Sequence, residues 1–237
     1  MKKEFIEKIQ SRGYWRINFQ PLVDEEKIKS LGDCSSIVEK HNVQLRGWNY
    51  PHFPRRKGDD AGLEPMNNYY QGWIDWNNHK EFWRMYQSGQ YLHYLALRED
   101  WAEFSGWGIT ENQPYKAGEK LSIVGTIYQI TEIFEFLSRL ATEGIYDEGI
   151  QLSLSLKNTE NRKLHLDDPM RGPLWEDYKT TIKDIDFTEK YTKEDLITKP
   201  HEIAIEVIIY FFDRFGWHKP PIDTFKKDQD NLLNRRF

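Results

Sequence analysis

The sequence predicts an α+β fold in which helices pack on antiparallel sheet around an aromatic-rich core. Segments with an apolar residue at every second position, typical of half-buried strands, alternate with segments whose apolar residues lie three and four apart, typical of helices. Aromatic residues make up 15% of the 237 residues, so many large side chains are available to fill a core. Short turn-forming dipeptides join successive strand patterns, and such connections favour antiparallel pairing.

In the N-terminal part of the chain, glycine and proline residues separate the predicted elements. Gly13, Pro21 and Pro51 each follow a stretch with a helical or alternating period, and these residue types commonly end helices and strands. Residues 54–68 combine charges, glycines and prolines with little apolar content, which predicts a long surface loop. The elements predicted before this loop are a helix over residues 1–10, a strand over 14–19, a helix over 24–41 and a strand over 43–50.

Residues 69–97 predict a meander of strands. Asn77-Asn78 and Ser88-Gly89 are turn-forming pairs, and Ser88-Gly89 has the length of a two-residue hairpin turn. Apolar and aromatic residues occur on both alternating faces of residues 82–97. We therefore expect this hairpin to be central in the sheet and covered on both sides.

The C-terminal part begins with the clearest helical period in the chain, over residues 119–143. Residues 203–212 are apolar nearly all round, which predicts a helix buried in the core. A boundary near residues 106–118 would divide the chain into an aromatic, β-dominated half (1–110) and a helix–strand–helix half (111–237), unless both belong to one continuous domain. The other predicted elements are strands over 150–156, 162–166 and 180–187, a helix that begins at residue 200 and a final helix over 225–237.

Composition excludes several classes of protein. A net charge of -5 argues against general binding to nucleic acids or anionic membranes, which normally requires a basic excess. The single cysteine, Cys34, excludes an internal disulfide and fits a reducing compartment. The strongest apolar run, Ile203–Phe212, is half the length of a membrane span, and no secretory signal follows Met1. We therefore expect a cytoplasmic protein without membrane segments.

The familiar catalytic and cofactor motifs are missing from the sequence. The seven histidines show no metal-ligand spacing, and no second cysteine is present to pair with Cys34. Neither a glycine-rich phosphate loop nor a nucleophile elbow occurs. The sequence therefore predicts neither a metal nor a cofactor.

The aromatic residues are concentrated between Arg46 and Trp107, a stretch that contains 15 of the 35. Its first signature is Arg46–His52, with the sequence RGWNYPH. Gly47 and Pro51 would bring Arg46, Trp48 and His52 to one neighbourhood, where the arginine could hold an anion beside the indole. Alternatively, Arg46 pairs with a local acid and Trp48 belongs to the core.

The second signature is Tyr86–Tyr91, with the sequence YQSGQY. A hairpin around it could present Arg84, Gln87, Gln90 and His93 to a ligand. Hairpin geometry by itself is an equally complete explanation of the Ser88-Gly89 turn.

Two sets of acidic residues suggest enzymatic alternatives. Asp75 and Glu81 lie among aromatic residues, where desolvation would raise the pKa of a carboxyl group, so these residues or His93 could act as acid or base while Arg46 holds a phosphate. Alternation also places Asp184 and Asp186 on one face of a strand, followed by Glu189 and Lys190. These residue types occur in metal-dependent nucleases, although the spacing matches no nuclease pattern.

The aromatic stretch resembles an uncharacterised bacterial sequence family. The resemblance rests on RGWNYPH, on Trp73-Ile74-Asp75-Trp76 and on Phe82–His93, and it covers about residues 43–98. Similar segments occur in stand-alone proteins and downstream of Schlafen-type, AlbA-like ATP-binding domains, and this sequence shows no such domain. The resemblance names no activity. It implies a role beside nucleotide- or nucleic-acid-handling systems, in a mobile-element or phage-defence context.

These observations together favour a binding or adaptor module. Its partner would be a protein or a small anionic ligand. The alternatives are a hydrolase acting on a nucleotide or nucleic acid, and a homodimer whose interface is the aromatic stretch. The residues expected to bind the ligand are Arg46, Trp48, His52, Arg84, Gln87 and His93.

Overall fold

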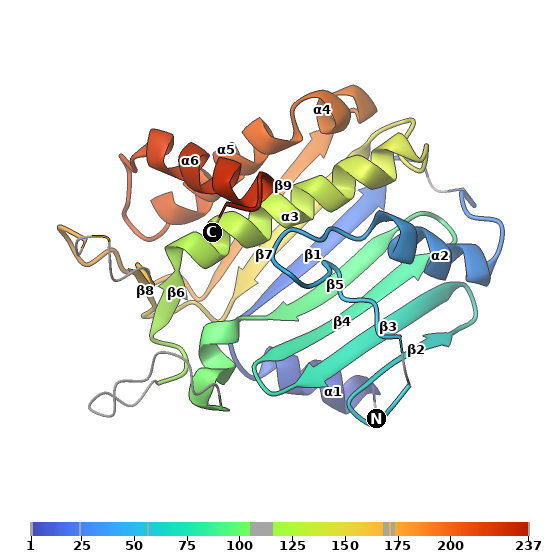
Figure 1. Ribbon diagram of the computed structural model, residues 1–237, viewed down its shortest axis with the longest axis horizontal. Coiled ribbons are helices and arrows are strands. Elements are labelled where there is room, and N and C mark those ends of the chain that lie inside the picture. Colours follow the sequence, from blue (N-terminus) through green and yellow to red (C-terminus); the bar gives the residue numbers. More distant parts are fainter. Residues whose placement is uncertain are drawn as a thin grey trace.

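A computed structural model describes residues 2–23, 25–55, 57–104, 116–167, 171 and 174–236 (Figure 1). These residues form the predicted α+β fold, with one seven-stranded antiparallel sheet, a short pair of parallel strands and six helices. The strands are β1 (Tyr14–Pro21), β2 (Ala61–Pro65), β3 (Tyr69–Trp76), β4 (His79–Tyr86), β5 (Tyr91–Ala96), β6 (Lys120–Ser122), β7 (Ile150–Lys157), β8 (Lys163–His165) and β9 (Asp184–Tyr191). The helices are α1 (Lys2–Gln10), α2 (Leu31–His41), α3 (Ile123–Thr142), α4 (Lys193–Thr198), α5 (Pro200–Asp213) and α6 (Ile222–Leu233), with a 3-10 helix η1 (Arg98–Phe104).

The strands of the large sheet lie in the order β2-β3-β4-β5-β1-β7-β9, and β6 pairs with β8 outside it. Hairpins connect β2 to β3, β3 to β4 and β4 to β5. The β4–β5 hairpin is central in the sheet, as predicted. Strand β1 then pairs with β5 on one side and with β7 on the other, so that Tyr14 lies opposite both Ala96 and Lys157. The N-terminal and C-terminal parts of the chain therefore contribute to one sheet. The expected boundary at residue 110 lies outside the described residues.

Helices cover the two faces of the sheet unequally. On one face, α2, α3 and α5 pack over a large core that includes Trp15 of β1, Trp83 of β4 and Phe211 of α5 (Figure 1). On the other face, α1 covers a smaller cluster of buried residues that includes Ile9, Phe82 and Ala96. The alternation of side chains along β4 and β5 therefore separates two different environments.

The long helix α3 begins and ends at the residues that sequence patterns favour. The side chain of Ser122 accepts a hydrogen bond from the backbone N–H of Gly125 and caps the helix. Gly144 follows its C-terminus at a φ of 86°, a conformation that glycine adopts without strain. The helix starts at residue 123, four residues later than predicted, because residues 120–122 form β6.

Three other predictions require correction. Residues 43–50 were expected to form a strand, but only Val43 and Tyr50 pair, with each other, around a turn in which Gly47 has a φ of 83°. The expected loop over residues 54–68 contains β2, because Ala61–Pro65 pairs with β3 despite its glycine and proline. The helix expected from residue 24 begins at Leu31, since Ser30 caps it. In all three cases pairing or capping outweighs the local sequence pattern.

The remaining predicted elements are present with shifted ends. Strand β9 extends to Tyr191, the buried helix is α5, and the final helix is α6. No helix within the described ranges is long and apolar enough to cross a membrane.

Candidate ligand-binding site

Arg46 is held by a buried carboxylate of α3. Its Nε donates to Oε1 of Glu132 at 3.0 Å, and its terminal nitrogen donates to the other carboxylate oxygen and to Oε1 of Gln129 at 3.3 Å. The side chain of Arg46 is 13% exposed and that of Glu132 is fully buried. Burial raises the pKa of Glu132 more than Arg46 lowers it. Arg46 therefore has the structural pairing that the sequence offered as the alternative to anion binding.

A second arginine lies at the same tryptophan. The guanidinium carbon of Arg98, at the start of η1, is 4.8 Å from the centre of the Trp48 ring, and that of Arg46 is 5.1 Å from it. Arg98 is an exposed residue, and none of the carboxylates that the structure describes forms an ion pair with it. Partial burial, followed by repulsion from Arg46, lowers the pKa of Arg98. Arg98 therefore lacks an ion pair with a described carboxylate, although the nearby charges of Glu99 and Glu132 stabilise its guanidinium.

One further donor near this pair is unused. The side-chain oxygen of Gln129 accepts from Arg46, but its amide nitrogen is buried and has no partner among the described residues. A buried donor without a partner costs free energy unless a ligand or water accepts from it. Gln129, which contacts Arg46, therefore keeps one buried N–H group without an acceptor among the described residues.

His52 and His93 belong to a buried cluster centred on Glu81. The backbone N–H of His52 donates to Oε1 of Glu81 at 2.6 Å, and its carbonyl accepts from Nε1 of Trp83 at 3.1 Å. Oε2 of Glu81 lies 3.4 Å from Nε2 of His93 and 3.5 Å from Nε2 of His79. These distances are long for hydrogen bonds, and all three atoms are buried without a hydrogen-bond partner in the described part of the chain. Glu81 thus fixes the end of the RGWNYPH segment.

The electrostatics of this cluster favour a charged carboxylate. Burial acts to raise the pKa of Glu81, but the two neighbouring imidazoles, His79 and His93, together outweigh it and lower that pKa to about 2. The ring of His52 lies 4.8 Å from that of Trp76 and 6.0 Å from that of His79, and burial lowers the pKa of His52. Within the described residues, no group of three or more histidine, cysteine or acidic side chains is arranged to hold a metal ion.

The six predicted ligand-binding residues do not line one site. Four of them, Arg46, Trp48, His52 and His93, are associated with the face that α3 covers. Arg84 lies on the opposite face, where its Nε donates to Oε1 of Gln71 at 3.2 Å and its guanidinium lies over Tyr69. The separation follows from the pairing of Trp83 with His93, which places Arg84 on the other side of β4. Gln87 lies beyond the end of β4, in the turn.

The acidic residues behind the enzymatic alternatives are also separated. Asp75 lies on the face opposite to Glu81 and contacts the ammonium groups of Lys8 at 2.7 Å and Lys80 at 2.8 Å. These two carboxylates therefore do not form an acid–base pair.

On the edge strand β9, Asp184 and Asp186 do share a face. They lie 3.9 and 2.8 Å from the ammonium group of Lys157. Lys190 follows on the same face and Glu189 on the other, so a nuclease-like cluster of these residues is not assembled.

No sequence motif marks Arg98, Gln129, Glu132 or His79 as part of a site. Gln129 and Glu132 lie about 80 residues after Arg46 in an ordinary helical pattern, so no local signal connects them. Arg98 directly follows the predicted hairpin, and only the packing of η1 brings it to Trp48. Comparisons with protein-family models, with curated proteins and with solved structures found no match to this chain.

Proposed function

We propose that the protein is a binding module for a small anionic ligand that binds beside Trp48. The observation that carries this proposal is the Arg98 guanidinium, which lies over the indole without an ion pair to any described carboxylate, while Arg46 already contacts Glu132. An anion that accepted from Arg98 would relieve the repulsion between the two arginines. Binding, rather than catalysis, is favoured because the acidic residue of this site that contacts Arg46, Glu132, is fully buried and already engaged.

The available groups define the chemistry of the ligand. The guanidinium of Arg98 offers a planar set of donors that matches a carboxylate or a phosphate. The indole of Trp48 provides a flat apolar wall against which a planar group could stack. Because the charges of Glu99 and Glu132 both act on Arg98, the site has little excess positive charge, which suits a ligand with one anionic group better than a polyanion.

Fluorine NMR of the protein labelled with 5-fluorotryptophan tests the proposal. The Trp48 resonance is assigned with Trp48→Phe, and the probes are acetate, inorganic phosphate and AMP; the nucleotide is included because of the family resemblance. We expect a saturable shift of the Trp48 resonance with at least one probe. Arg98→Ala should weaken that binding about tenfold or more, the strength of a hydrogen bond to a charged group.

Arg84→Ala is the matched control, because Arg84 also lies over an aromatic ring, at 4.7 Å from Tyr69, but on the opposite face of the sheet. The proposal predicts no change in affinity for this variant. An absent Trp48 shift with all three probes, or an equal affinity in Arg98→Ala, would refute it.

One observation supports a second candidate, a hydrolase acting on nucleotides or nucleic acids. The ionised Glu81 faces His79, whose side chain is 21% exposed, and a carboxylate of this kind can orient an imidazole as a general base. Under this candidate, hydrolysis of AMP or of bis(p-nitrophenyl) phosphate is lost in both His79→Ala and Glu81→Gln. An absence of turnover of both compounds by the unmodified protein rules the candidate out for these substrates.

A further inference from the structure

The YQSGQY turn supports one wall of a surface groove. The backbone carbonyl of Gln87 accepts from the N–H groups of Lys27 and Ile28, both at 2.9 Å. Its side-chain amide donates to the carbonyls of Ile28 at 3.3 Å and Lys29 at 3.4 Å, and to the carboxylate of Glu26 at 2.8 Å. Gln87, which was expected to bind a ligand, therefore fixes the segment 27–29 to the hairpin.

The same turn supports the floor of the groove. Gly89 has a φ of 83°, and a Cβ atom there would lie 2.7 Å from Cγ2 of Ile145. The hydroxyl of Tyr146 donates to the carbonyl of Gly89 at 3.1 Å. Glycine at this position therefore allows the segment after α3 to pack directly on the turn.

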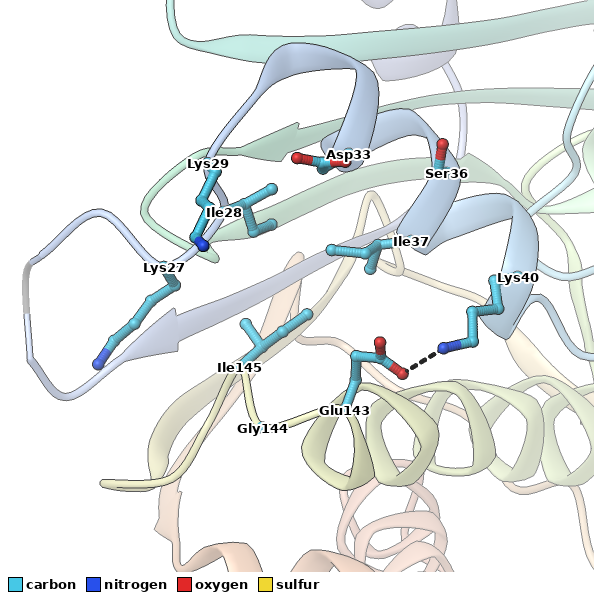
Figure 2. A pocket seen from close by; sticks show the side chains of 10 residues that line it. All are labelled: Lys27, Ile28, Lys29, Asp33, Ser36, Ile37, Lys40, Glu143, Gly144 and Ile145. Carbon is cyan, nitrogen blue, oxygen red and sulfur yellow. Dashed lines mark hydrogen bonds and ion pairs between the residues drawn. The ribbon is translucent and has the colours of Figure 1, made fainter.

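The groove lies between segment 27–29, α2 and the turn that follows α3 (Figure 2). Its volume is about 400 Å³, which is sufficient for a small organic molecule. Ile28, Ile37 and Ile145 give it an apolar floor, while lysines stand at its rim. A ligand that filled it would contact apolar carbon below and ammonium groups above.

Among the described residues, one of the rim lysines has no carboxylate partner. Lys27 contacts Glu25 at 2.7 Å and Glu148 at 2.8 Å, and Lys40 contacts Glu143 at 2.7 Å. For Lys29, no ion pair with any described carboxylate is formed. Asp33 also lines the groove, and its carboxylate accepts a hydrogen bond from the hydroxyl of Ser30 at 2.8 Å in the first turn of α2, where the helix dipole favours a negative charge. The groove therefore offers one ammonium group without an ion pair to a described residue, that of Lys29, and one acidic group that is compensated within α2.

We propose that this groove binds a small amphipathic carboxylate, with the anionic group at Lys29 and a short alkyl or similar apolar body on the isoleucine floor. The single unpaired cation suits one carboxylate, and the volume suits a body of a few carbon atoms. The groove shares no residue with the Trp48 site, so this inference and the proposed function can fail independently.

A titration followed by amide NMR tests the groove with acetate, butyrate and hexanoate. We expect the amide signals of residues 27–29 and 143–145 to shift, and the affinity to rise about fourfold per added methylene until the floor is covered. Hexylammonium, which also contains six carbon atoms but has the opposite charge, should not produce these shifts.

Two variants separate the contributions of charge and floor. Lys29→Ala should weaken hexanoate binding about tenfold or more, whereas Lys227→Ala, at an exposed lysine of α6, should leave it unchanged. Ile37→Ala should flatten the dependence on chain length. The proposal is overturned if hexanoate does not shift the groove signals, if hexylammonium binds equally well, or if Lys29→Ala binds hexanoate like the unmodified protein.

Discussion

The two aromatic signatures differ in how completely their polar groups are satisfied. Below the RGWNYPH segment, buried polar atoms of Glu81, His79, His93 and Gln129 lack hydrogen-bond partners among the described residues. At the YQSGQY turn, Gln87 uses its carbonyl and its side-chain amide in five hydrogen bonds to residues 26–29. Buried polar groups are normally hydrogen-bonded. The first region therefore contains most of the buried side-chain atoms without a partner in the described part of the chain, whereas the second region supports neighbouring segments.

The polar residues of both signatures bind other parts of the same chain. Arg46 and Gln87 were both expected to contact a ligand, yet each is occupied by another segment of the same chain. The cationic groups without an ion pair to a described carboxylate are their spatial neighbours, Arg98 and Lys29. The two signatures therefore lie next to the candidate ligand-binding residues, but the positive charge that would bind a ligand comes from residues outside the signatures.

The largest expected effect tests the Arg46–Glu132 pair. Arg46→Ala should lower the free energy of unfolding by about 3–5 kcal/mol, because it leaves a fully buried carboxylate without its partner. Urea denaturation measures this loss. Arg84→Ala, which removes a partly buried arginine from the other face, should cost about 1 kcal/mol. Similar costs for the two variants would contradict a structural role specific to Arg46.

A pH titration tests the cluster around Glu81. The pKa of this carboxyl is about 2 in the folded protein, below its ordinary value of 4.5. Glu81 therefore contributes stability that is fully present above pH 4.5 and is lost as the pH falls from 4.5 towards 2. The contribution is about 3 kcal/mol at neutral pH.

The measurement is the unfolding free energy of the unmodified protein and of Glu81→Gln between pH 6 and pH 2.5. The advantage of the unmodified protein should shrink as the solution becomes more acidic. Two parallel curves would show that Glu81 has the same pKa in the folded and unfolded states.

The smallest expected effect compares the glycines of the two signatures. Gly47 and Gly89 have the same φ of 83°, so alanine at either position should cost about 1–2 kcal/mol for the left-handed conformation. A Cβ at Gly47 meets no atom within 4 Å, whereas one at Gly89 meets Ile145. Gly89→Ala should therefore cost about 1–3 kcal/mol more than Gly47→Ala in thermal or urea unfolding. Equal costs would mean that Ile145 moves away without penalty.

Periodicity in the sequence determined most of the secondary structure. The helical spacing of 119–143 and the alternation of 150–156 correspond to α3 and β7, and the Ser88-Gly89 pair lies in the β4–β5 turn. These patterns work because an element that buries one face must repeat apolar residues at its own period. The α+β class followed from the same patterns.

The composition of the candidate sites was decided by tertiary structure alone. Arg46 meets Glu132 across 86 residues of sequence, and Gln87 meets Ile28 across 59. Such contacts depend on strand register and helix packing, which no local pattern encodes. Residues 43–50 show the same limit, because their β-forming residues close a turn on themselves once Gly47 adopts a positive φ. The sequence thus specified most of the elements, while their packing decided which charges are neutralised and which, at Arg98 and Lys29, have no ion pair with a described residue.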